Sequence, residues 1–338
     1  MTKQKNIAVI GAGVIGLSTV LCLQKEFPSA SVSLYADKFN EDTLSAGAGG
    51  IFRPELNIDE DFERLSKWCE DSFSHFLELA RSPEASKAGT QLVSGYHLSS
   101  NPLQIQNPLL LKLLPEYREL QEKELKMFPR HYKYGMFYTT IITDCRYYLP
   151  WMKSKFQEAN GNIVPKYIIN ICEIAENHDV VVNCSGLGAK QLLKDKMLIP
   201  VRGQTIKVKA PWIKHFYYGD EVYVLPGIDY VTLGGVKDHG SYNMNVSSYQ
   251  KQFIWDKCTE LVPSLKRAEI AWDWVGLRPY RPSVRIDANF IPCNGNYKMV
   301  VNNYGHGGHG VALSWGTALE ATQLVKKFFV EKNFVAKL

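Results

Sequence analysis

The sequence lacks any long hydrophobic run and any block of basic charge. No apolar stretch approaches the ~20 residues that a helix needs to span a bilayer, so we expect no membrane partner. The 39 Lys and Arg residues exceed the 34 Asp and Glu residues by five, and they are scattered along the chain. Such scatter does not predict nucleic-acid binding. The opening MTKQKN leads directly into a strand pattern, so we expect no secretory signal.

Cysteine is also scarce, with seven residues and no Cys-x-x-Cys spacing. An odd number in a chain of 338 residues fits a reducing, intracellular compartment better than a disulfide framework. His306 and His309 are three positions apart, but no third ligand candidate stands out, so we expect no metal. Internal repeats and low-complexity tracts are missing too. With 45% hydrophobic and 22% charged residues, the composition predicts an ordinary globular protein.

The strongest motif lies near the amino end of the chain. The short apolar run 6–10 predicts a buried parallel strand, and an apolar pattern with helical spacing follows until Pro28. Between them Gly11, Gly13 and Gly16 form G-x-G-x-x-G. The first glycine permits a tight turn, the second admits a pyrophosphate, and the third lets the helix pack against the strand. The helix N-terminus then favours the negative charge of the pyrophosphate.

A second strand at 31–36 ends at Asp37, which lies 21 residues after Gly16. A carboxylate at this distance meets a ribose 2′-hydroxyl in dinucleotide-binding folds. The combination predicts a dinucleotide site, the alternative being a glycine-rich turn in an ordinary βαβ unit. FAD and NAD share this fingerprint, so the motif alone does not choose between them. The expected cofactor contacts in this region are Gly11, Ala12, Gly13, Val14, Ile15, Gly16, Asp37 and Lys38.

The rest of the chain alternates between α/β and β-rich patterns. The glycine-rich segment 43–54 would bring backbone N–H groups close to a ligand, the alternative being a flexible surface loop. The other expected elements are a helical pattern at 59–82, a polar and turn-rich region at 83–105, a strand at 133–143, a strand followed by small residues at 179–189, an antiparallel sheet at 201–240, a helix at 248–261, and a strand at 299–303 followed by a helix.

These patterns predict an α/β fold with two domains. The first is a Rossmann-like FAD-binding domain that is discontinuous in sequence and formed by residues 1–54, 140–195 and 285–338. The second is a β-rich substrate-binding domain formed by residues 55–139 and 196–284.

Two long signatures, VGLRPYRP at 275–282 and NNYGHGGHGVALSWGTALEA at 302–321, resemble the D-amino-acid oxidase and D-aspartate oxidase family of flavoproteins. VNCSGLGA at 182–189, VRGQTIKVKAPWIKHF at 201–216 and VTLGG at 231–235 follow the same family order, so the resemblance covers nearly the whole chain. It implies non-covalent FAD and oxidation of a D-amino acid by direct hydride transfer to flavin N5. O₂ then reoxidises the flavin and gives H₂O₂, and the imino acid hydrolyses to a 2-oxo acid and ammonia.

The resemblance also implies roles for individual residues. Arg278 would grip the substrate α-carboxylate, Tyr223 would add a hydrogen bond to it, and the Gly308 carbonyl would accept from the amine. Arg281, in the same motif, is assigned to structure. No acid or base residue is required, so neither His215 nor His306 is taken as a catalytic base. The further positions expected near the cofactor are Thr43, Ser45, Gly49, Gly50, Ile51, Ser185, Gly186, Gly305, His306, Gly307, Gly308 and Gly310.

Two basic residues favour the branch of the family that takes D-aspartate and D-glutamate. A buried side-chain carboxylate needs a positive partner. Lys237 stands where the resemblance places an arginine in D-aspartate oxidases, and Arg53 follows the flavin-facing loop at a pocket-lining position that is usually not basic in either branch. The acidic branch carries another arginine where this chain has Tyr217 and Tyr218, which counts against the assignment. Arg53 and Lys237 could instead be solvated surface charges, and an oxidase of neutral or varied D-amino acids stays open as the alternative.

The final tripeptide Ala336-Lys337-Leu338 is a conservative variant of the S-K-L peroxisomal signal. An oxidase that releases H₂O₂ benefits from confinement with catalase, so we expect the peroxisomal matrix and a peroxisomal import receptor as a partner. A homo-oligomer is compatible with the sequence. Two other classes share part of these features: a nicotinamide-dependent dehydrogenase, and a flavoprotein without catalytic activity.

Overall fold

The computed structural model describes residues 4–56, 58–102 and 106–335, and only the backbone from 332 to 335. The strands are β1 (Asn6–Ile10), β2 (Ser31–Ala36), β3 (Thr90–Ser99), β4 (Tyr117–Glu119), β5 (Tyr134–Thr143), β6 (Asn162–Pro165), β7 (Val180–Asn183), β8 (Ile199–Lys209), β9 (Phe216–Tyr218), β10 (Tyr223–Pro226), β11 (Val231–Gly234), β12 (Asp238–His239), β13 (Glu269–Cys293) and β14 (Asn296–His306).

The helices are α1 (Val14–Glu26), α2 (Phe62–Ala80), α3 (Ala85–Ala88), α4 (Pro108–Leu113), α5 (Glu122–Leu125), α6 (Cys145–Glu158), α7 (Cys172–Ala175), α8 (Ala189–Leu192), α9 (Ser248–Leu261) and α10 (Gly310–Val335). Within the described ranges, none of them is long and apolar enough to cross a membrane.

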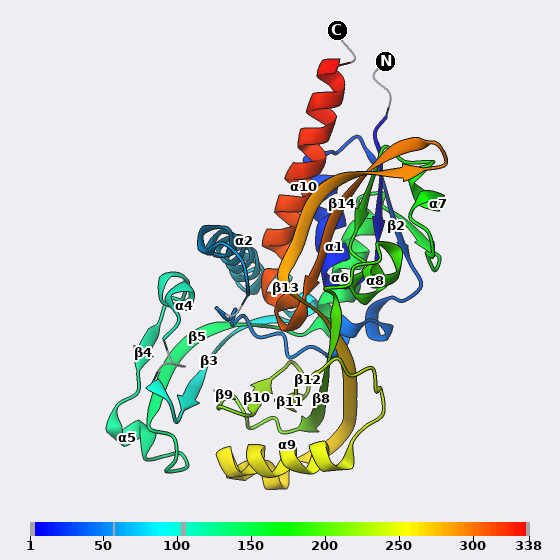
Figure 1. Ribbon diagram of the computed structural model, residues 1–338. Coiled ribbons are helices and arrows are strands. Elements are labelled where there is room, and N and C mark those ends of the chain that lie inside the picture. Colours follow the sequence, from blue (N-terminus) through cyan, green and yellow to red (C-terminus); the bar gives the residue numbers. More distant parts are fainter. Residues whose placement is uncertain (1–3, 57, 103–105, 336–338) are drawn as a thin grey trace.

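One sheet passes through the whole molecule (Figure 1). Its strand order is β4-β5-β3-β9-β10-β11-β8-β13-β14-β7-β1-β2-β6, and β12 also pairs with β8. At one end β14, β7, β1, β2 and β6 are parallel. From β14 to β9 each neighbouring pair is antiparallel. The predicted α/β fold is confirmed.

The parallel end is a layered nucleotide-binding unit. Ile7 and Val9 of β1 pack into the apolar core that contains Leu17 of α1, whereas Ala8 and Ile10 pack on the opposite face of the sheet. A strand buried on both faces reads as a continuous apolar run, as predicted for residues 6–10. β1 lies between β2 and β7 in the sheet, so the chain continues from β1 to the strand on one side and later returns to the strand on its other side. This reversal creates a crevice at the carboxyl ends of the two strands.

The antiparallel part is built on two long strands. β8 pairs with β13, and β10 and β11 form a hairpin around Pro226 and Gly227, where the Gly227 N–H donates to the Tyr230 carbonyl at 2.9 Å. Helix α9 lies against this layer (Figure 1), and Ile254 and Cys258 are buried there. The antiparallel sheet and the helix at 248–261 were both predicted.

The region 83–105 corrects one expectation, because it contains the ten-residue strand β3 rather than only turns. β3 pairs with β5 on one edge and with β9 on the other. Its polar side chains find partners inside the fold: Ser99 Oγ donates to Asp220 at 2.7 Å, and Thr90 Oγ1 donates to Thr143 at 3.3 Å. The polar residues of this segment suggested turns in the sequence. They are buried in a strand because their hydrogen-bond partners come from distant segments of the folded chain.

The cysteines give a second correction. Cys172 of α7 and Cys293 of β13 form a disulfide across 121 residues, whereas the odd number of cysteines and the lack of Cys-x-x-Cys had favoured reduced thiols. The other five cysteines are free and buried.

Helix α2 packs against α10, although it was assigned to the substrate-binding domain. The Gly316 N–H of α10 donates to Ser72 Oγ at 2.9 Å, and a Cβ on Gly316 would lie 2.3 Å from the Trp68 carbonyl oxygen. The domain boundaries themselves stay a prediction.

Candidate functional site

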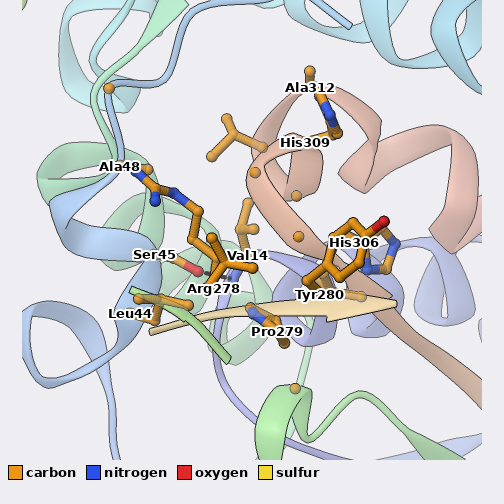
Figure 2. A pocket seen from close by; sticks show the side chains of 18 of the residues that line it. Val14, Leu44, Ser45, Ala48, Arg278, Pro279, Tyr280, His306, His309 and Ala312 are labelled. Atoms are coloured by element: carbon orange, nitrogen blue, oxygen red, sulfur yellow. Dashed lines mark hydrogen bonds between the residues drawn. The ribbon is translucent and has the colours of Figure 1, made fainter. Parts of the chain in front are cut away.

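A cavity of about 320 Å³ lies where the parallel and antiparallel parts of the sheet meet. Its walls include the start of α1, residues from the segment 44–55 with Ile58, parts of β8, β10 and β13, and the glycine-rich segment 305–312 (Figure 2). The wall at the parallel end follows the carboxyl ends of β1, β7 and β14. This is the position at which open α/β sheets bind their ligands.

The glycine motif shapes the cofactor end of the cavity. Gly11 has φ +102°, and a Cβ there would lie 2.5 Å from the Cys184 carbonyl oxygen. A Cβ on Gly16 would lie 1.8 Å from the Gly11 carbonyl oxygen, so helix and strand pack with no room for a side chain. The Val14 N–H at the start of α1 donates to Ser45 Oγ at 3.1 Å (Figure 2). The first turn of α1 carries no acidic residue, so the positive end of the helix dipole faces the cofactor end of the cavity without a neutralising side chain.

Some buried polar atoms of the lining residues need a partner. Thr205 Oγ1 and Asn303 Oδ1 have no hydrogen-bond partner among the described residues, and their side chains are 2% exposed or less. Buried polar groups are normally paired, so these atoms fit a bound group rich in donors and acceptors. At Gly308 the nearest atom to an added Cβ is Arg278 Cδ, at 3.8 Å, which leaves that backbone open. The residues present therefore fit FAD.

The structure brings most of the predicted residues together. Those that line the cavity are Val14, Ile15, Ser45, Gly49, Gly50, Ile51, Arg53, Gly186, Tyr223, Lys237, Arg278, Gly305, His306, Gly307, Gly308 and Gly310. The predicted residues outside the lining are Gly11, Ala12, Gly13, Gly16, Asp37, Lys38, Thr43 and Ser185. Asp37 and Lys38 are exposed just beyond β2. Their contact with the cofactor stays a prediction.

Arg278 extends from β13 into the cavity, toward the segment that holds Ala48 (Figure 2). It donates through Nη1 to the Val236 carbonyl at 3.2 Å. Its path depends on Gly203 of the neighbouring strand β8, where a Cβ would lie 2.3 Å from the guanidinium. The Tyr223 side chain likewise lies over a glycine of a neighbouring strand, since a Cβ on Gly234 would lie 2.4 Å from the Tyr223 hydroxyl.

The Tyr223 hydroxyl is held as a neutral phenol. Burial raises its pKa, and this effect outweighs the nearby Arg278 guanidinium, which lowers it. A neutral phenol beside a permanent cation can donate one hydrogen bond while the guanidinium donates two. Together they form a donor set for one carboxylate.

A cluster of charged side chains forms another wall of the cavity. Glu55 accepts from Arg53 Nη1 at 2.9 Å, and its other oxygen lies 3.7 Å from Lys237 Nζ and 3.9 Å from His309 Nε2. Burial alone would raise the Glu55 pKa, but His309, Lys237 and Arg53 together lower it to about 2. Glu55 is therefore ionised at neutral pH. It had not been singled out, although an acid two positions after Arg53 was a visible signal.

Arg53 is a buried cation rather than a solvated surface charge, because its side chain is only 13% exposed. Its guanidinium lies over the Tyr218 ring at 4.0 Å, a cation–π contact. Tyr218 is one of the two tyrosines found where the acidic branch carries an arginine, so Arg53 brings a positive charge to that neighbourhood. Lys237 differs, with a side chain that is 54% exposed.

The histidines of the cavity are neutral at physiological pH. Burial lowers the pKa of His306 to about 3 and that of His309 to about 4. His306 Nε2 lies 3.2 Å from Thr317 Oγ1. In the described part of the chain, no three His, Cys, Asp or Glu residues are placed to hold a metal ion. His215 lies outside the lining and contacts the Ser94 carbonyl at 2.9 Å.

Comparisons with known proteins agree with this geometry. The family model described as "FAD dependent oxidoreductase" matches residues 6–324. The chain is 39% identical to a human protein named D-aspartate oxidase, with 95% of this chain and 94% of the relative covered. It is 35% identical to a protein of Dugesia ryukyuensis named D-amino acid oxidase, with 96% and 99% covered. Glycine oxidase from Geobacillus kaustophilus shares the fold, with a TM-score of 0.78, 17% identity, and 96% and 95% covered.

Proposed function

The chain belongs to the family of FAD-dependent oxidoreductases, and from this premise we propose that it oxidises D-amino acids with O₂, preferring acidic ones. The substrate, O₂ and water give a 2-oxo acid, ammonia and H₂O₂. FAD, when bound, accepts the two electrons and passes them to O₂. The residues that would hold it line the cavity from the start of α1 and from segments 45–51 and 305–310.

The protein's task in this reaction is to orient the substrate. Arg278 binds the α-carboxylate through its planar guanidinium, and Tyr223 adds a hydroxyl donor. The Gly308 carbonyl accepts from the substrate amine. Arg278 and Tyr223 thus hold the carboxylate and Gly308 holds the amine, which fixes two of the four substituents of the α-carbon. Contact of the side chain with the cavity wall that contains Arg53 fixes a third, so that the hydrogen of the D-enantiomer faces the cofactor. His306 and His309, with pKa values of about 3 and 4, are poor bases at neutral pH, so the chemistry relies on positioning.

The observation that supports acidic substrates is the buried cation Arg53 in the cavity wall. Arg53 and Lys237 contribute two positive charges and Glu55 one negative charge, which leaves one positive charge uncompensated. A side-chain carboxylate would balance it and would avoid the cost of entering an apolar pocket unpaired.

A second candidate follows from the same cluster. Glu55 already contacts both Arg53 and Lys237, which favours neutral or varied D-amino acids if that contact persists. Purified protein should be yellow and lose its flavin absorbance when an accepted D-amino acid is added without O₂. Absence of flavin bands would favour a nicotinamide enzyme, and bands that no D-amino acid bleaches would favour a flavoprotein without activity.

We also propose that the protein acts in the peroxisomal matrix and is recognised by the import receptor. Ala336-Lys337-Leu338 supports this, and it lies outside the described residues. A fluorescent protein fused at the amino end should accumulate in peroxisomes and become cytosolic when the tripeptide is deleted. Cytosolic fluorescence with the tripeptide intact would refute the proposal.

A further inference from the structure

The charged cluster of the cavity contains a carboxylate of the protein's own in the place expected for a substrate carboxylate. Resting on the proposed function, we infer that Glu55 sets substrate preference by competing with the side-chain carboxylate of an acidic D-amino acid for Arg53 and Lys237. We call Arg53 and Lys237 the cationic subsite, and the Glu55 carboxylate occupies it when no acidic substrate is bound. Its charge limits how strongly acidic substrates are favoured over neutral ones.

The geometry of the cluster supports competition. Glu55, Lys237 and His309 come from three segments far apart in sequence and all line the cavity. One Glu55 oxygen contacts Arg53 at 2.9 Å, while the other lies 3.7 Å from Lys237, which exceeds hydrogen-bond distance. The Lys237 contact is therefore the weaker one, and the half-exposed lysine can turn to a substrate with little loss.

Arg53 also has unused binding capacity. Nη1 donates to Glu55 and Nη2 lies 3.2 Å from His97 Nε2. Burial and the nearby Arg53 charge lower the His97 pKa to about 3, so the neutral ring can accept. The buried Tyr138 hydroxyl also interacts with the guanidinium. A guanidinium offers five N–H donors, and with the described residues Nη1 and Nη2 each use one of their two, so the terminal nitrogens can accept a second carboxylate as partner.

Charge balance explains why the chain keeps Glu55 at this position. A buried arginine without a counter-ion is costly, and Glu55 compensates Arg53 when no substrate is present. When an acidic substrate enters, it meets a subsite with one positive charge rather than two. Removing the Glu55 charge should therefore strengthen binding of a second carboxylate while leaving the Arg278 grip on the α-carboxylate in place.

The test compares Glu55→Gln with Asp59→Asn. Asp59 is an exposed acid of the same segment outside the cavity lining, so it controls for the change in net charge. The ratio of kcat/KM for D-aspartate to that for D-alanine should rise about tenfold in Glu55→Gln. It should change less than about twofold in Asp59→Asn. Glu55→Asp, which keeps the charge, should stay nearer to the wild-type ratio.

A binding measurement gives a second readout that does not depend on turnover. Succinate and propionate are D-aspartate and D-alanine without the amino group, so they cannot be oxidised in this reaction. In Glu55→Gln the Kd of succinate, followed by the flavin absorbance change, should fall about tenfold relative to that of propionate. If Glu55→Gln is too unstable to assay, the same comparison in Glu55→Ala decides, because that substitution also removes the charge and a shift in the same direction is expected.

Three outcomes would overturn the inference. An unchanged ratio would mean that Glu55 does not compete. A lower D-aspartate ratio would mean that Glu55 holds Arg53 in its binding position. Loss of activity on D-lysine or D-arginine alone would mean that Glu55 recognises basic side chains. Wild-type protein that oxidises no D-amino acid would instead refute the proposed function, so the two failures are distinguishable.

Discussion

Replacing Arg53 with Met tests whether the buried cation recognises the substrate side chain. Met preserves most of the aliphatic length and removes the charge. In the structure Arg53 contacts Glu55, His97 and the Tyr218 ring. Without it, the Lys237 and Glu55 charges cancel and the subsite has no net positive charge. Losing a charge-assisted contact to a desolvated carboxylate costs about 1.5–3 kcal/mol.

That cost corresponds to a loss of roughly ten- to a hundredfold in kcat/KM for D-aspartate. D-alanine makes no contact with the subsite, so its kcat/KM should change only about twofold to threefold. The assay is steady-state oxidation of both substrates, with FAD content measured by absorbance. Lys237→Met should show the same trend with a smaller loss, because the lysine is half exposed. Arg130→Met, an exposed control, should leave both substrates unaffected.

Two results would refute this reasoning about Arg53. Equal losses for D-aspartate and D-alanine would show that Arg53 shapes the neighbouring flavin-facing loop rather than the side-chain subsite. An unchanged ratio in both Arg53→Met and Lys237→Met would favour the enzyme of neutral D-amino acids. Because Arg53 and Glu55 are in contact, their effects on the ratio should not be additive in the double variant.

Two other predictions concern the α-carboxylate grip and acid stability. Arg278→Ala should retain FAD but lower kcat/KM about a hundredfold for every D-amino acid, from the loss of roughly 3 kcal/mol; wild-type-like kinetics would remove Arg278 from the site. The melting temperature should fall as pH decreases from about 6.5 toward 4, because the unfolded chain then binds protons that the buried histidines do not; an unchanged melting temperature over this range would contradict it. The histidines with lowered pKa values are His75, His97, His306 and His309.

The nucleotide-binding end could be predicted because its signals are local. The strand at 6–10, the glycines and the helix that follows are encoded within about one βαβ unit. The start of α1 at Val14 and the end of β2 at Ala36 agree with the pattern. Residues 31–36 and 179–189 needed no knowledge of distant partners.

Other features depend on contacts between distant segments. β3 is recognisable only through its pairing with β5 and β9, and β13 runs for 25 residues although only its central motif stood out. The Cys172–Cys293 disulfide likewise joins distant segments. The role of Glu55 was missed for the same reason, since Lys237 and His309 reach it only in the folded chain. The sequence indicated that Arg53 and Lys237 are cations of the site. Only the folded structure shows that Glu55 is the counter-ion of both.

Oxygen uptake by the purified, FAD-loaded protein over a panel of D- and L-amino acids is the most direct test of the proposed activity. We expect kcat/KM to be highest for D-aspartate or D-glutamate, measurable but lower for D-alanine, and absent for the L-enantiomers, with H₂O₂ formed in equal amount to the O₂ consumed. Oxidation of L-enantiomers, or no oxidation of any D-amino acid by protein that retains FAD, would contradict the assignment of Arg278, Tyr223 and Gly308 to orienting a D-amino acid.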